Sequence, residues 1–435
     1  MDVVGFVGVM TVITALVHLY LWRRLVRDTV RERSRRRAGA LLLTGLAALI
    51  PATIAAAALP LRYERWLAWP GYLWLGIMFY LLVTLLALEV PVLVARLALP
   101  RRRERSGAGQ PLPEPANVAS GGPASVASGG LASVASGGPV ARGPEQPGPV
   151  DGGGSPDIDL GRRRLLRRGA AITAGLVAAG ATGWGMARAY RPPEVRRVEV
   201  PLRRLDPRAD GLRVVVVADL HVGPLYGRGQ VRRVVEVVNG LDADLVAVVG
   251  DMVSSEPGDV RGSAAPLRDL RTRYGAFFVT GNHEYYTGHE EWIEAAGDLG
   301  LRVLRNQRVE IVHRGGAIDL AGVNDPEGSR HDDPPDYAAA LGDRDPSRPV
   351  VLLAHQPVQV HEAATYGVDL QLSGHTHGGQ LFPFHLLVRL EQPVLSGLAE
   401  VDGTQVYVTN GAGFWGPPMR VGADPDVSLL ELRAA

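Results

Sequence analysis

The chain has 435 residues, a formal net charge of +1 and no cysteine. This length leaves room for more than one domain. The nearly balanced charge gives no support to a general polyanion-binding function, so nucleic-acid binding is not expected. Without cysteine, the chain has no disulfide bonds and no thiolate metal site.

Four apolar stretches in the N-terminal part of the chain are long enough to cross a membrane. They are residues 3–22, 38–60, 69–94 and 169–187. An apolar helix of about 20 residues spans the hydrocarbon core of a bilayer. A buried helix of a soluble protein is also apolar on all sides, but four such stretches with arginine flanks favour membrane spans. We therefore predict three transmembrane helices in residues 1–99 and a fourth in residues 162–190.

The arginines predict the orientation of these spans. Eight arginines lie between the first two spans, whereas only Arg62 and Arg65 lie between the second and third. Five more arginines lie within residues 96–105, after the third span, and five within residues 162–168, before the fourth. Because cytoplasmic loops carry an excess of arginine and lysine, both arginine-rich loops are predicted to be cytoplasmic. The protein is then a multi-pass protein of the cell membrane, with its C-terminal domain outside the cytoplasm.

A segment rich in Pro, Gly, Ser and Ala separates the third and fourth spans. Residues 100–161 carry few large apolar groups and contain a near-repeat of eight residues that starts at Val118, Val126 and Val134. Too little apolar surface is present to offset the entropy lost on ordering. This segment is predicted to be a disordered linker that acts as a tether.

The residues before the fourth span have two interpretations, which the sequence supports equally. Gly161-Arg162-Arg163-Arg164-Leu165-Leu166-Arg167 resembles a twin-arginine export signal, which would make the twin-arginine translocase a partner. The alternative is an ordinary arginine flank of a membrane span. Ala187-Arg188-Ala189 resembles a small-x-small cleavage site. Most such triplets are not cut, so a retained anchor is predicted.

Strand-like runs alternate with amphipathic segments in the remaining part, residues 196–435. Strands are predicted at 213–219, 244–250, 276–281 and 302–304, with amphipathic segments at 230–239, 266–274 and 290–299. This alternation predicts βαβ units. The second half is richer in strands, at 309–312, 317–322, 350–355, 369–373 and 405–409. Two sheets packed face to face with helices outside accommodate both halves. The predicted fold is therefore α/β, a four-layer α/β/β/α sandwich.

Five short motifs rich in Asp and His follow one another through this domain. They are Asp219-Leu220-His221, Gly250-Asp251, Gly281-Asn282-His283-Glu284, Ala354-His355 and Gly374-His375-Thr376-His377. Four of them directly follow a strand-like run, and the carboxyl ends of strands in an open α/β sheet converge on one crevice. The side chains of Asp219 and His221 are expected on the same side of an extended strand end. Gly250 is expected to allow a tight turn that aims the Asp251 carboxylate.

Such a set of side chains is typical of a site for two divalent metal ions. Phosphate ester hydrolysis needs a nucleophile at neutral pH and neutralisation of the charge on the phosphoryl oxygens. Two metal ions about 3.5–4 Å apart supply both. Oxygen and imidazole ligands with one bridging carboxylate hold such a pair. This ligation suits Mn²⁺, Fe or Zn²⁺, and the order of affinities alone does not decide among them.

The motifs resemble those of the calcineurin-like metallophosphoesterase superfamily, over residues 212–432. The similarity is greater to bacterial membrane-associated phosphoesterases with a twin-arginine-type leader, and it extends to residues 373–380 and 410–418. The resemblance implies the α/β/β/α sandwich, two divalent metal ions as cofactors and the activity of a metal-dependent phosphoric ester hydrolase.

The resemblance also implies a role for each motif residue. One metal ion would be held by Asp219, His221, Asp251 and His377, and the second by Asp251, Asn282, His355 and His375, with Asp251 bridging. His283 would not bind metal but would stabilise the phosphoryl group or protonate the leaving oxygen. The ordinary histidine pKa of about 6.5 suits this role. Asp251 and His283 are thus the predicted catalytic residues.

Several nearby residues keep two interpretations. Glu284 either orients a ligand or simply starts a helix. Tyr285 and His289 are more typical of core or surface positions than of a substrate pocket. The acidic segment 325–336 is either a solvated connection or a lid. Trp415 is either a core residue or an apolar wall beside the metal ions, which would suit a lipid-linked phosphoester.

The predicted function is hydrolysis of a phosphomonoester or phosphodiester of the cell envelope, by attack of a hydroxide that bridges the metal ions. The alternative is a metal-dependent module that binds or senses phosphate or a phospholipid without turnover. A third interpretation is a scaffold protein whose function depends more on the four membrane spans than on the C-terminal domain. The unaltered Asn282-His283 pair favours the hydrolase. The sequence does not identify the substrate.

Overall fold

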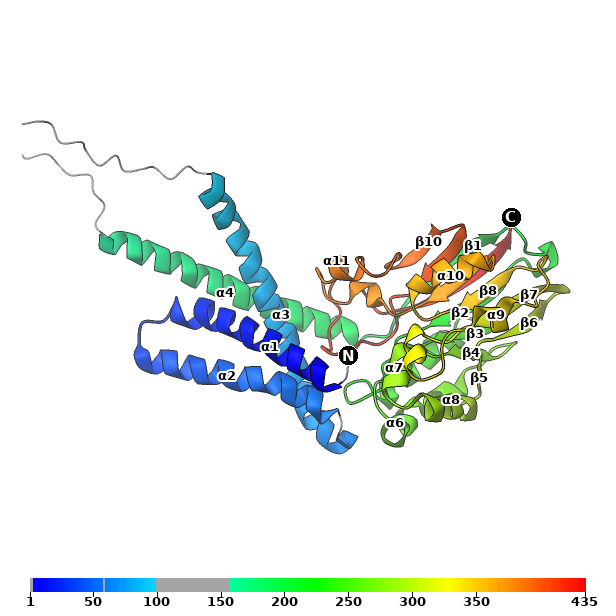
Figure 1. Cartoon of the computed structure of the whole chain (residues 1–435), viewed down its shortest axis with the longest axis horizontal. Coiled ribbons are helices and arrows are strands. Elements are labelled where there is room, and N and C mark those ends of the chain that lie inside the picture. Colours follow the sequence, from blue (N-terminus) through cyan, green and yellow to red (C-terminus); the bar gives the residue numbers. More distant parts are fainter. Residues whose placement is uncertain (1–2, 58, 99–155) are drawn as a thin grey trace, which may run out of the picture.

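Four long helices adjoin one α/β domain in the computed structural model, which describes residues 3–57, 59–98 and 156–435 (Figure 1). The helices are α1 (Val3–Leu21), α2 (Arg33–Ala56), α3 (Leu61–Ala98) and α4 (Pro156–Ala189), and a π-helical turn (Trp22–Arg27) continues α1. Each contains a stretch long and apolar enough to cross a membrane, at Gly8–Arg27, Arg33–Ala56, Leu61–Val90 and Arg164–Ala189. All four predicted apolar spans are therefore helices of sufficient length.

Helix α4 begins earlier than the sequence predicts. Most of the predicted linker, residues 100–161, lies outside the described residues, but residues 156–161 already belong to α4. Pro156 suits a helix start, because the N–H that proline lacks would have no intrahelical partner there. Residues 156–161 are therefore helix rather than linker.

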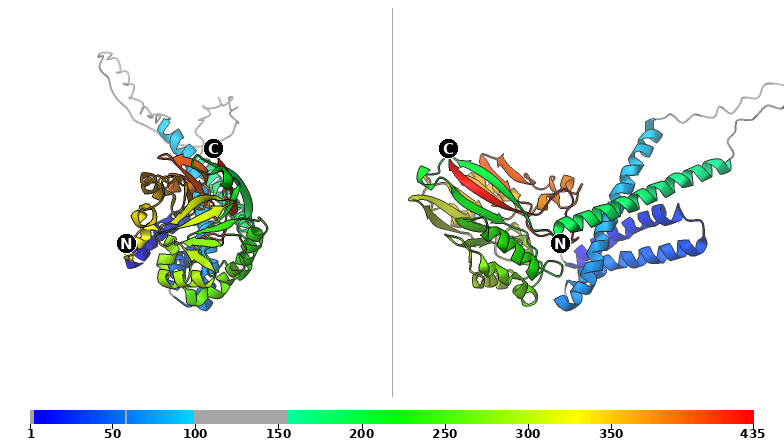
Figure 2. Two further views of the ribbon diagram at one scale, coloured as in Figure 1. Left: turned by 90° about the vertical axis from the view of Figure 1, so that its right-hand side faces the viewer. Right: turned by 180° about the vertical axis from the view of Figure 1, so that it is seen from behind.

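The arginine-rich start of α4 lies beside the arginine-rich turn between α1 and α2, at the end of the bundle far from the α/β domain (Figure 1). Arg168 Nε donates a hydrogen bond to Thr29 O at 3.0 Å, and Arg167 lies 3.7 Å from Asp28. These contacts join the beginning of α4 to the turn after α1. The opposite end of α4, at Ala189, is buried in the core of the α/β domain. The right-hand view of Figure 2 shows the helices at one end of this domain.

Two six-stranded sheets form the domain. The first has the order β1-β12-β2-β3-β4-β5 and consists of β1 (Glu194–Leu202), β12 (Asp426–Ala434), β2 (Leu212–Val217), β3 (Leu245–Val249), β4 (Ala276–Val279) and β5 (Leu301–Val303). The second has the order β10-β11-β9-β8-β7-β6 and consists of β10 (Gly397–Val401), β11 (Thr404–Val408), β9 (Leu370–Ser373), β8 (Val350–Leu353), β7 (Gly316–Gly322) and β6 (Gln307–His313). Strands β2 to β5 are parallel, and so are β7, β8, β9 and β11. Loops that follow parallel strands emerge at the same edge of a sheet.

Alternating apolar side chains bury both faces of these sheets. Between the sheets, Val214 and Val216 of β2 share a core with Leu353 of β8. The other face of the first sheet packs on α5 (Arg228–Asn239) and α8 (His289–Asp298). The outer face of the second sheet packs on α9 (Tyr337–Leu341) and α10 (Val360–Thr365). This arrangement confirms the predicted α/β/β/α sandwich.

Some elements differ from those predicted. Strands β1, β10 and β12 are not among the predicted strands, and β12 inserts between β1 and β2 although it ends the chain. The amphipathic segment expected at 266–274 is replaced by α6 (Pro257–Ala264) and a 3-10 turn (Ala265–Asp269). The helical region lies earlier in the chain than predicted, because the side chains that pack into the core there are those of Val260, Ala264 and Leu267.

Candidate metal centre

The five motifs meet where loops leave both sheets. The loops follow β2, β3, β4, β8 and β9, and α7 (Asn282–Tyr286) begins within the third of them. Among the described residues, Asp, Glu and His side chains that could hold a metal ion form three close groups, all drawn from these motifs. The convergence expected from strand ends is therefore present in the fold.

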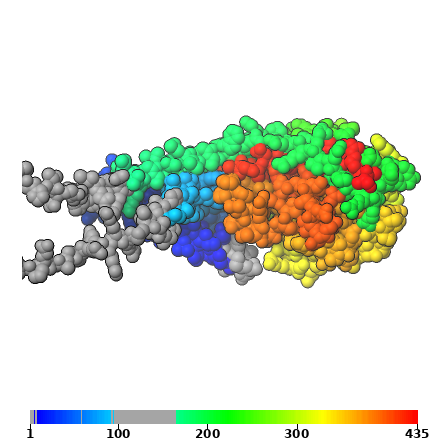
Figure 3. All heavy atoms as spheres, turned by 90° about the horizontal axis from the view of Figure 1, so that it is seen from above, coloured from blue at the N-terminus to red at the C-terminus, as the bar shows by residue number. Residues whose placement is uncertain are grey.

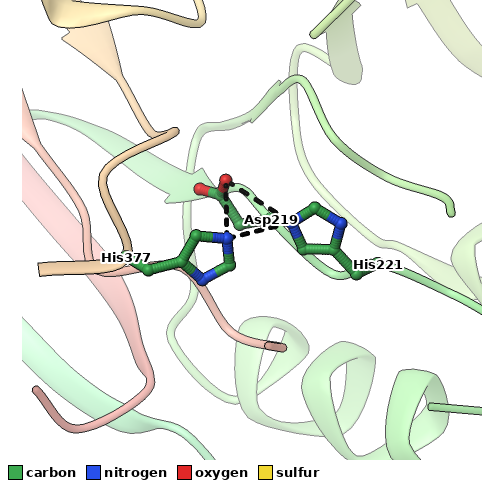
Figure 4. Close-up of side chains that lie close together, drawn as sticks. All are labelled: Asp219, His221 and His377. Carbon is green, nitrogen blue, oxygen red and sulfur yellow. Dashed lines mark hydrogen bonds and ion pairs between the residues drawn. The ribbon is translucent and has the colours of Figure 1, made fainter. Parts of the chain in front are cut away.

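Asp219, His221 and His377 form the first group (Figure 4). The Nε2 atoms of the two histidines are 2.9 Å apart, and Asp219 Oδ1 lies 3.5 Å from His377 Nε2 and 3.9 Å from His221 Nε2. All three residues are buried. A cation about 2.1 Å from each nitrogen would satisfy both imidazoles, as zinc sites in proteins do.

Asp251, His355 and His375 form the second group. Asp251 Oδ2 is 3.2 Å from His355 Nε2 and also 3.7 Å from His221 Nε2, so this oxygen lies between the two groups. Asn282 Oδ1 lies 3.0 Å from His375 Nδ1. The structure thus brings all seven predicted ligands together. Their assignment as metal ligands stays a prediction.

His355 provides a test of whether these residues fit divalent cations. Its Nδ1 lies 2.8 Å from Val249 O, which places the proton on Nδ1 and leaves Nε2 as the free nitrogen. That Nε2 is buried and faces Asp251 Oδ2, itself an atom of a predicted ligand, at 3.2 Å. Neutral imidazoles and carboxylates aimed at common points are the donor set of Mn²⁺, Fe and Zn²⁺. The residues therefore fit the ions that the motifs imply.

Burial and mutual charge set the protonation of the centre. Burial lowers the pKa of His375 to about 3 and places those of His221 and His377 well below the ordinary value, so these imidazoles are neutral, the form that binds metal. Burial opposes a charge on His355 as well, but the Asp251 carboxylate raises its pKa well above the ordinary value. A proton on His355 therefore occupies the position that a cation would take.

Five of the predicted ligands have a left-handed backbone. The φ angle is 54° at Asp219, 50° at His221, 49° at Asp251, 69° at His375 and 51° at His377. Such a conformation costs a residue other than glycine roughly 1–3 kcal/mol and is concentrated at functional sites. Six other non-glycine residues of the described chain also have a positive φ, so the backbone strain supports a site here only through its concentration among the predicted ligands.

The positive φ angles also correct one expectation. Asp219 and His221 do not occupy an extended strand end, because β2 stops at Val217 and both residues are left-handed. Their side chains converge through the left-handed backbone at both residues instead. The tight turn expected at Gly250 is present, with a φ of 76°.

Two glycines let the ligands lie against the neighbouring backbone. A Cβ atom at Gly374 would be 2.3 Å from Asp219 Oδ2, and one at Gly281 would be 2.3 Å from Asp251 Oδ1. The backbone N–H of His375 donates to both oxygens of Asp219, and that of His283 donates to Asp251 Oδ1 at 2.9 Å. Close packing thus fixes the direction of both carboxylates.

Glu284 orients the loop that carries Asp251. Its Oε1 accepts hydrogen bonds from the backbone of Met252 and Val253, and its Oε2 accepts them from Asp251 and Gly281. The bond to Gly281 also closes a capping box at the start of α7. Both interpretations of Glu284 therefore hold, since one carboxylate caps the helix and positions a predicted ligand.

Arg420 is part of the centre but is not among the residues predicted for it. Its side chain is fully buried, donates to His377 O at 2.7 Å and lies 3.0 Å from His377 Nδ1. It also donates to the backbone oxygens of Asn410 and Gly413. Burial lowers its pKa to about 10, so it stays charged near neutral pH. No local pattern marks Arg420, because its partners are distant in sequence.

His283 lies at the open side of the centre. Its ring centroid is 4.5 Å from that of His221 and 6.1 Å from that of Trp415, and its Nδ1 is 3.3 Å from Ser254 Oγ. Trp415 is 55% exposed, whereas its neighbour Phe414 is buried in the core. Trp415 is thus an exposed aromatic group beside the centre rather than a core residue.

The segment 325–336 is solvated only in part, because residues 329–332, 334 and 336 are exposed whereas Asp325 and Asp333 are buried. Asp333 accepts hydrogen bonds from Tyr285, Asn324 and Arg305. We call these four residues the Asp333 cluster. His289 stacks on Tyr285 with 4.7 Å between ring centroids. Tyr285 and His289 therefore have structural contacts at this cluster, in agreement with their expected role.

Comparison with known proteins identifies the family. A family profile described as calcineurin-like phosphoesterase matches residues 212–379. A protein of Danio rerio named transmembrane protein with metallophosphoesterase domain is 38% identical over 262 residues, which are 58% of this chain and 60% of that protein. A metallophosphoesterase of Helicobacter pylori is 42% identical over 243 residues, which cover 55% of this chain and 64% of that protein. One of Aquifex aeolicus is 34% identical over 231 residues, 52% of this chain and 87% of that protein.

The chain belongs to the calcineurin-like metallophosphoesterase family. It matches somewhat less than two thirds of the length of the Danio rerio and Helicobacter pylori proteins. The family profile ends at Gly379, so Trp415 and Arg420 lie beyond it.

Proposed function

We propose that this chain is a membrane-anchored phosphoesterase with two divalent metal ions, which hydrolyses a phosphomonoester or phosphodiester of the cell envelope. One observation carries the proposal: Asp251 Oδ2 lies 3.2 Å from His355 Nε2 in one group of ligands and 3.7 Å from His221 Nε2 in the other. A single carboxylate shared by two groups of imidazoles is what a pair of neighbouring ions requires.

The ligands divide between the two ions. Asp219, His221, Asp251 and His377 would hold one ion, and Asp251, Asn282, His355 and His375 the other. When bound, such ions acidify water and neutralise charge on phosphoryl oxygens. Arg420 donates to the backbone oxygen of His377, and the ring of His377 turns its Nε2 toward His221.

His283 would act on the substrate directly. It is placed by its backbone bond to Asp251 Oδ1 and by Ser254, which contacts both His283 and His221. Burial lowers the pKa of His283, so the neutral ring can accept a hydrogen bond or, once protonated, give a proton to the leaving oxygen. Trp415 beside it offers an apolar face to the part of the substrate that does not react.

The membrane topology is part of the proposal. The arginine-rich start of α4 lies beside the turn after α1 and the domain adjoins the opposite end of α4, which under the positive-inside rule supports a domain outside the cytoplasm. Because the chain has no cysteine, a Val312→Cys variant carries a single thiol on the domain. A membrane-impermeant maleimide should label it in intact cells. Labelling only after lysis would show that the domain is cytoplasmic.

The same labelling separates the two interpretations of residues 161–167. Export by the twin-arginine translocase predicts that labelling of intact cells is lost in a strain without this translocase. An ordinary arginine flank predicts that labelling is unchanged.

The activity is tested with the full chain purified in detergent. We expect two Mn²⁺, Fe or Zn²⁺ ions per chain and hydrolysis of p-nitrophenyl phosphate or its bis-ester, with loss of turnover on chelation and recovery with Mn²⁺. Metal uptake without hydrolysis of any phosphoester would instead support a binding or sensing module.

A further inference from the structure

The surface between the metal centre and the membrane helices carries a row of exposed apolar side chains. We call residues 382–390 the apolar segment; it contains α11 (His385–Val388), none of whose residues is buried. Phe382 is 59% exposed, Leu387 58% and Leu390 83%. Contiguous apolar surface of this kind on a folded domain marks an interaction site.

The apolar segment begins where the domain meets the membrane helices. Leu381, which precedes it, shares a buried cluster with Met78 of α3, Ala178 of α4 and Met419. Figure 3 shows the orange part of the domain, which includes residues 380–400, lying against the light-blue helix α3. The segment is therefore continuous with the apolar surface of the spans.

Contacts with α3 and α4 fix the height of the segment along the bundle. A Cβ atom at Gly76 of α3 would lie 2.0 Å from the Cε of Met419, and the backbone N–H of Arg420 donates to Gly185 O of α4 at 3.0 Å. Trp184, next to Gly185, is 61% exposed, and exposed tryptophans gather at membrane–water interfaces. Leu381 pairs with Val421, one residue after Arg420. Gly185 lies two residues before the end of the predicted fourth span and Gly76 seven residues inside the predicted third, so the apolar segment starts beside the outer part of the spans.

We propose that the apolar segment 382–390 inserts into the boundary between headgroups and acyl chains of the same bilayer that α1 to α4 cross. Its apolar side chains suit this layer, and the exposed Arg389 beside them suits anionic headgroups. The occupant of this surface is lipid, not a second protein.

Insertion would hold the metal centre against the lipid surface. The apolar segment begins soon after His377, and the side chain of Gln380 joins the two regions. Gln380 Nε2 donates to Trp415 O at 2.8 Å, and Trp415 N donates to Gln380 Oε1 at 3.0 Å. Gln380 therefore ties the exposed tryptophan beside His283 to the start of the apolar segment. On the basis of the proposed function, the substrate class is a phosphoester carried by a membrane lipid.

The insertion is tested by spin labels on single cysteines, in the full chain reconstituted at one copy per nanodisc. A nitroxide at Leu387→Cys should collide more often with oxygen, which concentrates in lipid, than with a water-soluble nickel chelate. The control is Val312→Cys, a residue of β6 that is 50% exposed, where the chelate should be favoured. A label at 387 that matches the one at 312 would overturn the proposal. That result would indicate that the apolar segment contacts a second copy of the chain rather than lipid.

The substrate class is tested by replacing Leu386, Leu387 and Leu390 with serine. We expect hydrolysis of phosphatidic acid or phosphatidylglycerol in the nanodisc to fall by about tenfold or more. The free energy lost when even one leucine is no longer buried corresponds to a change of this size. Hydrolysis of the soluble p-nitrophenyl esters should stay unchanged, as it should for Val312→Ser on both kinds of substrate. An equal loss on soluble and lipid esters would overturn the lipid-presenting role. A parent that hydrolyses no ester would refute the proposed function, while the spin labels would still decide on insertion.

Discussion

The metal centre and the Asp333 cluster both contain buried carboxylates, but these carboxylates differ in how the protein satisfies their hydrogen bonds. Asp333 has hydrogen-bond donors on both oxygens, from Tyr285, Asn324 and Arg305. Asp251 has one backbone donor on Oδ1, whereas its Oδ2 faces the imidazoles of His355 and His221. One carboxylate is satisfied by the protein, and the other is aimed at a position shared with other ligand atoms.

The difference separates a structural network from a functional site. A buried charge whose bonding capacity is filled by the protein stabilises one conformation. A buried charge held in a left-handed backbone, and facing imidazoles that are themselves predicted ligands, carries a cost that the fold alone does not offset. Burial and charge by themselves therefore do not identify the site, whereas the convergence of several ligand atoms on shared positions does.

Replacing the shared carboxylate is expected to have the largest effect. In Asp251→Asn the amide can still accept the bond from His283 N, but it cannot bridge two cations as a carboxylate does. Turnover should fall by at least about 10³-fold, since metal-ion catalysis contributes several kcal/mol. Metal content should drop below two ions per chain by elemental analysis. Full turnover with both ions bound would contradict the bridging role.

Glu284→Gln is expected to weaken metal binding without removing a ligand. All four donors to Glu284 are backbone N–H groups, so the amide NH₂ of glutamine would face donors instead of acceptors. Metal affinity should fall about 10- to 100-fold, the usual effect of losing a residue that orients a ligand. Titration of the metal-free chain measures this, with Glu291→Gln on the exposed face of α8 as the control. Equal affinities in the two variants would show that the bonds of Glu284 do not position Asp251.

Gly374→Ala tests the close approach of the Asp219 carboxylate. The added Cβ would lie 2.3 Å from Asp219 Oδ2, so the loop or the carboxylate must move. Overpacking of this kind costs about 1–3 kcal/mol in the free energy of unfolding. Gly258→Ala in α6 is the matched control, because no atom lies within 4 Å of its Cβ position. Thermal unfolding should show the first variant less stable than the parent and the second equal or more stable.

Asp333→Asn should have the smallest effect, and on stability rather than on turnover. The amide keeps an acceptor for Tyr285 or Asn324 but loses the ion pair with Arg305. We expect a loss of about 1 kcal/mol in the free energy of unfolding. Turnover per folded molecule should stay within about twofold of the parent. A loss of turnover as large as that of Asp251→Asn would show that the cluster is part of the site.

Much of the metal centre could be predicted from the sequence because its signals are local. Each motif combines a strand-like run with a ligand-type side chain, and the glycines before Asp251 and His375 are adjacent in the chain. The order of the strands then required the motifs to meet at the ends of parallel neighbours. The four apolar spans and the sandwich followed from length and periodicity alone.

Only the tertiary structure decided the rest, because the partners are far apart in the chain. Arg420 reaches His377 across 43 positions, and β12 pairs with β1 and β2 from the other end of the domain. The left-handed backbone at Asp219 and His221 arises from packing, since residues other than glycine seldom adopt it on their own. The sequence thus determined which groups are available for the chemistry. Folding decided which of their bonds the protein satisfies and which it leaves for a ligand.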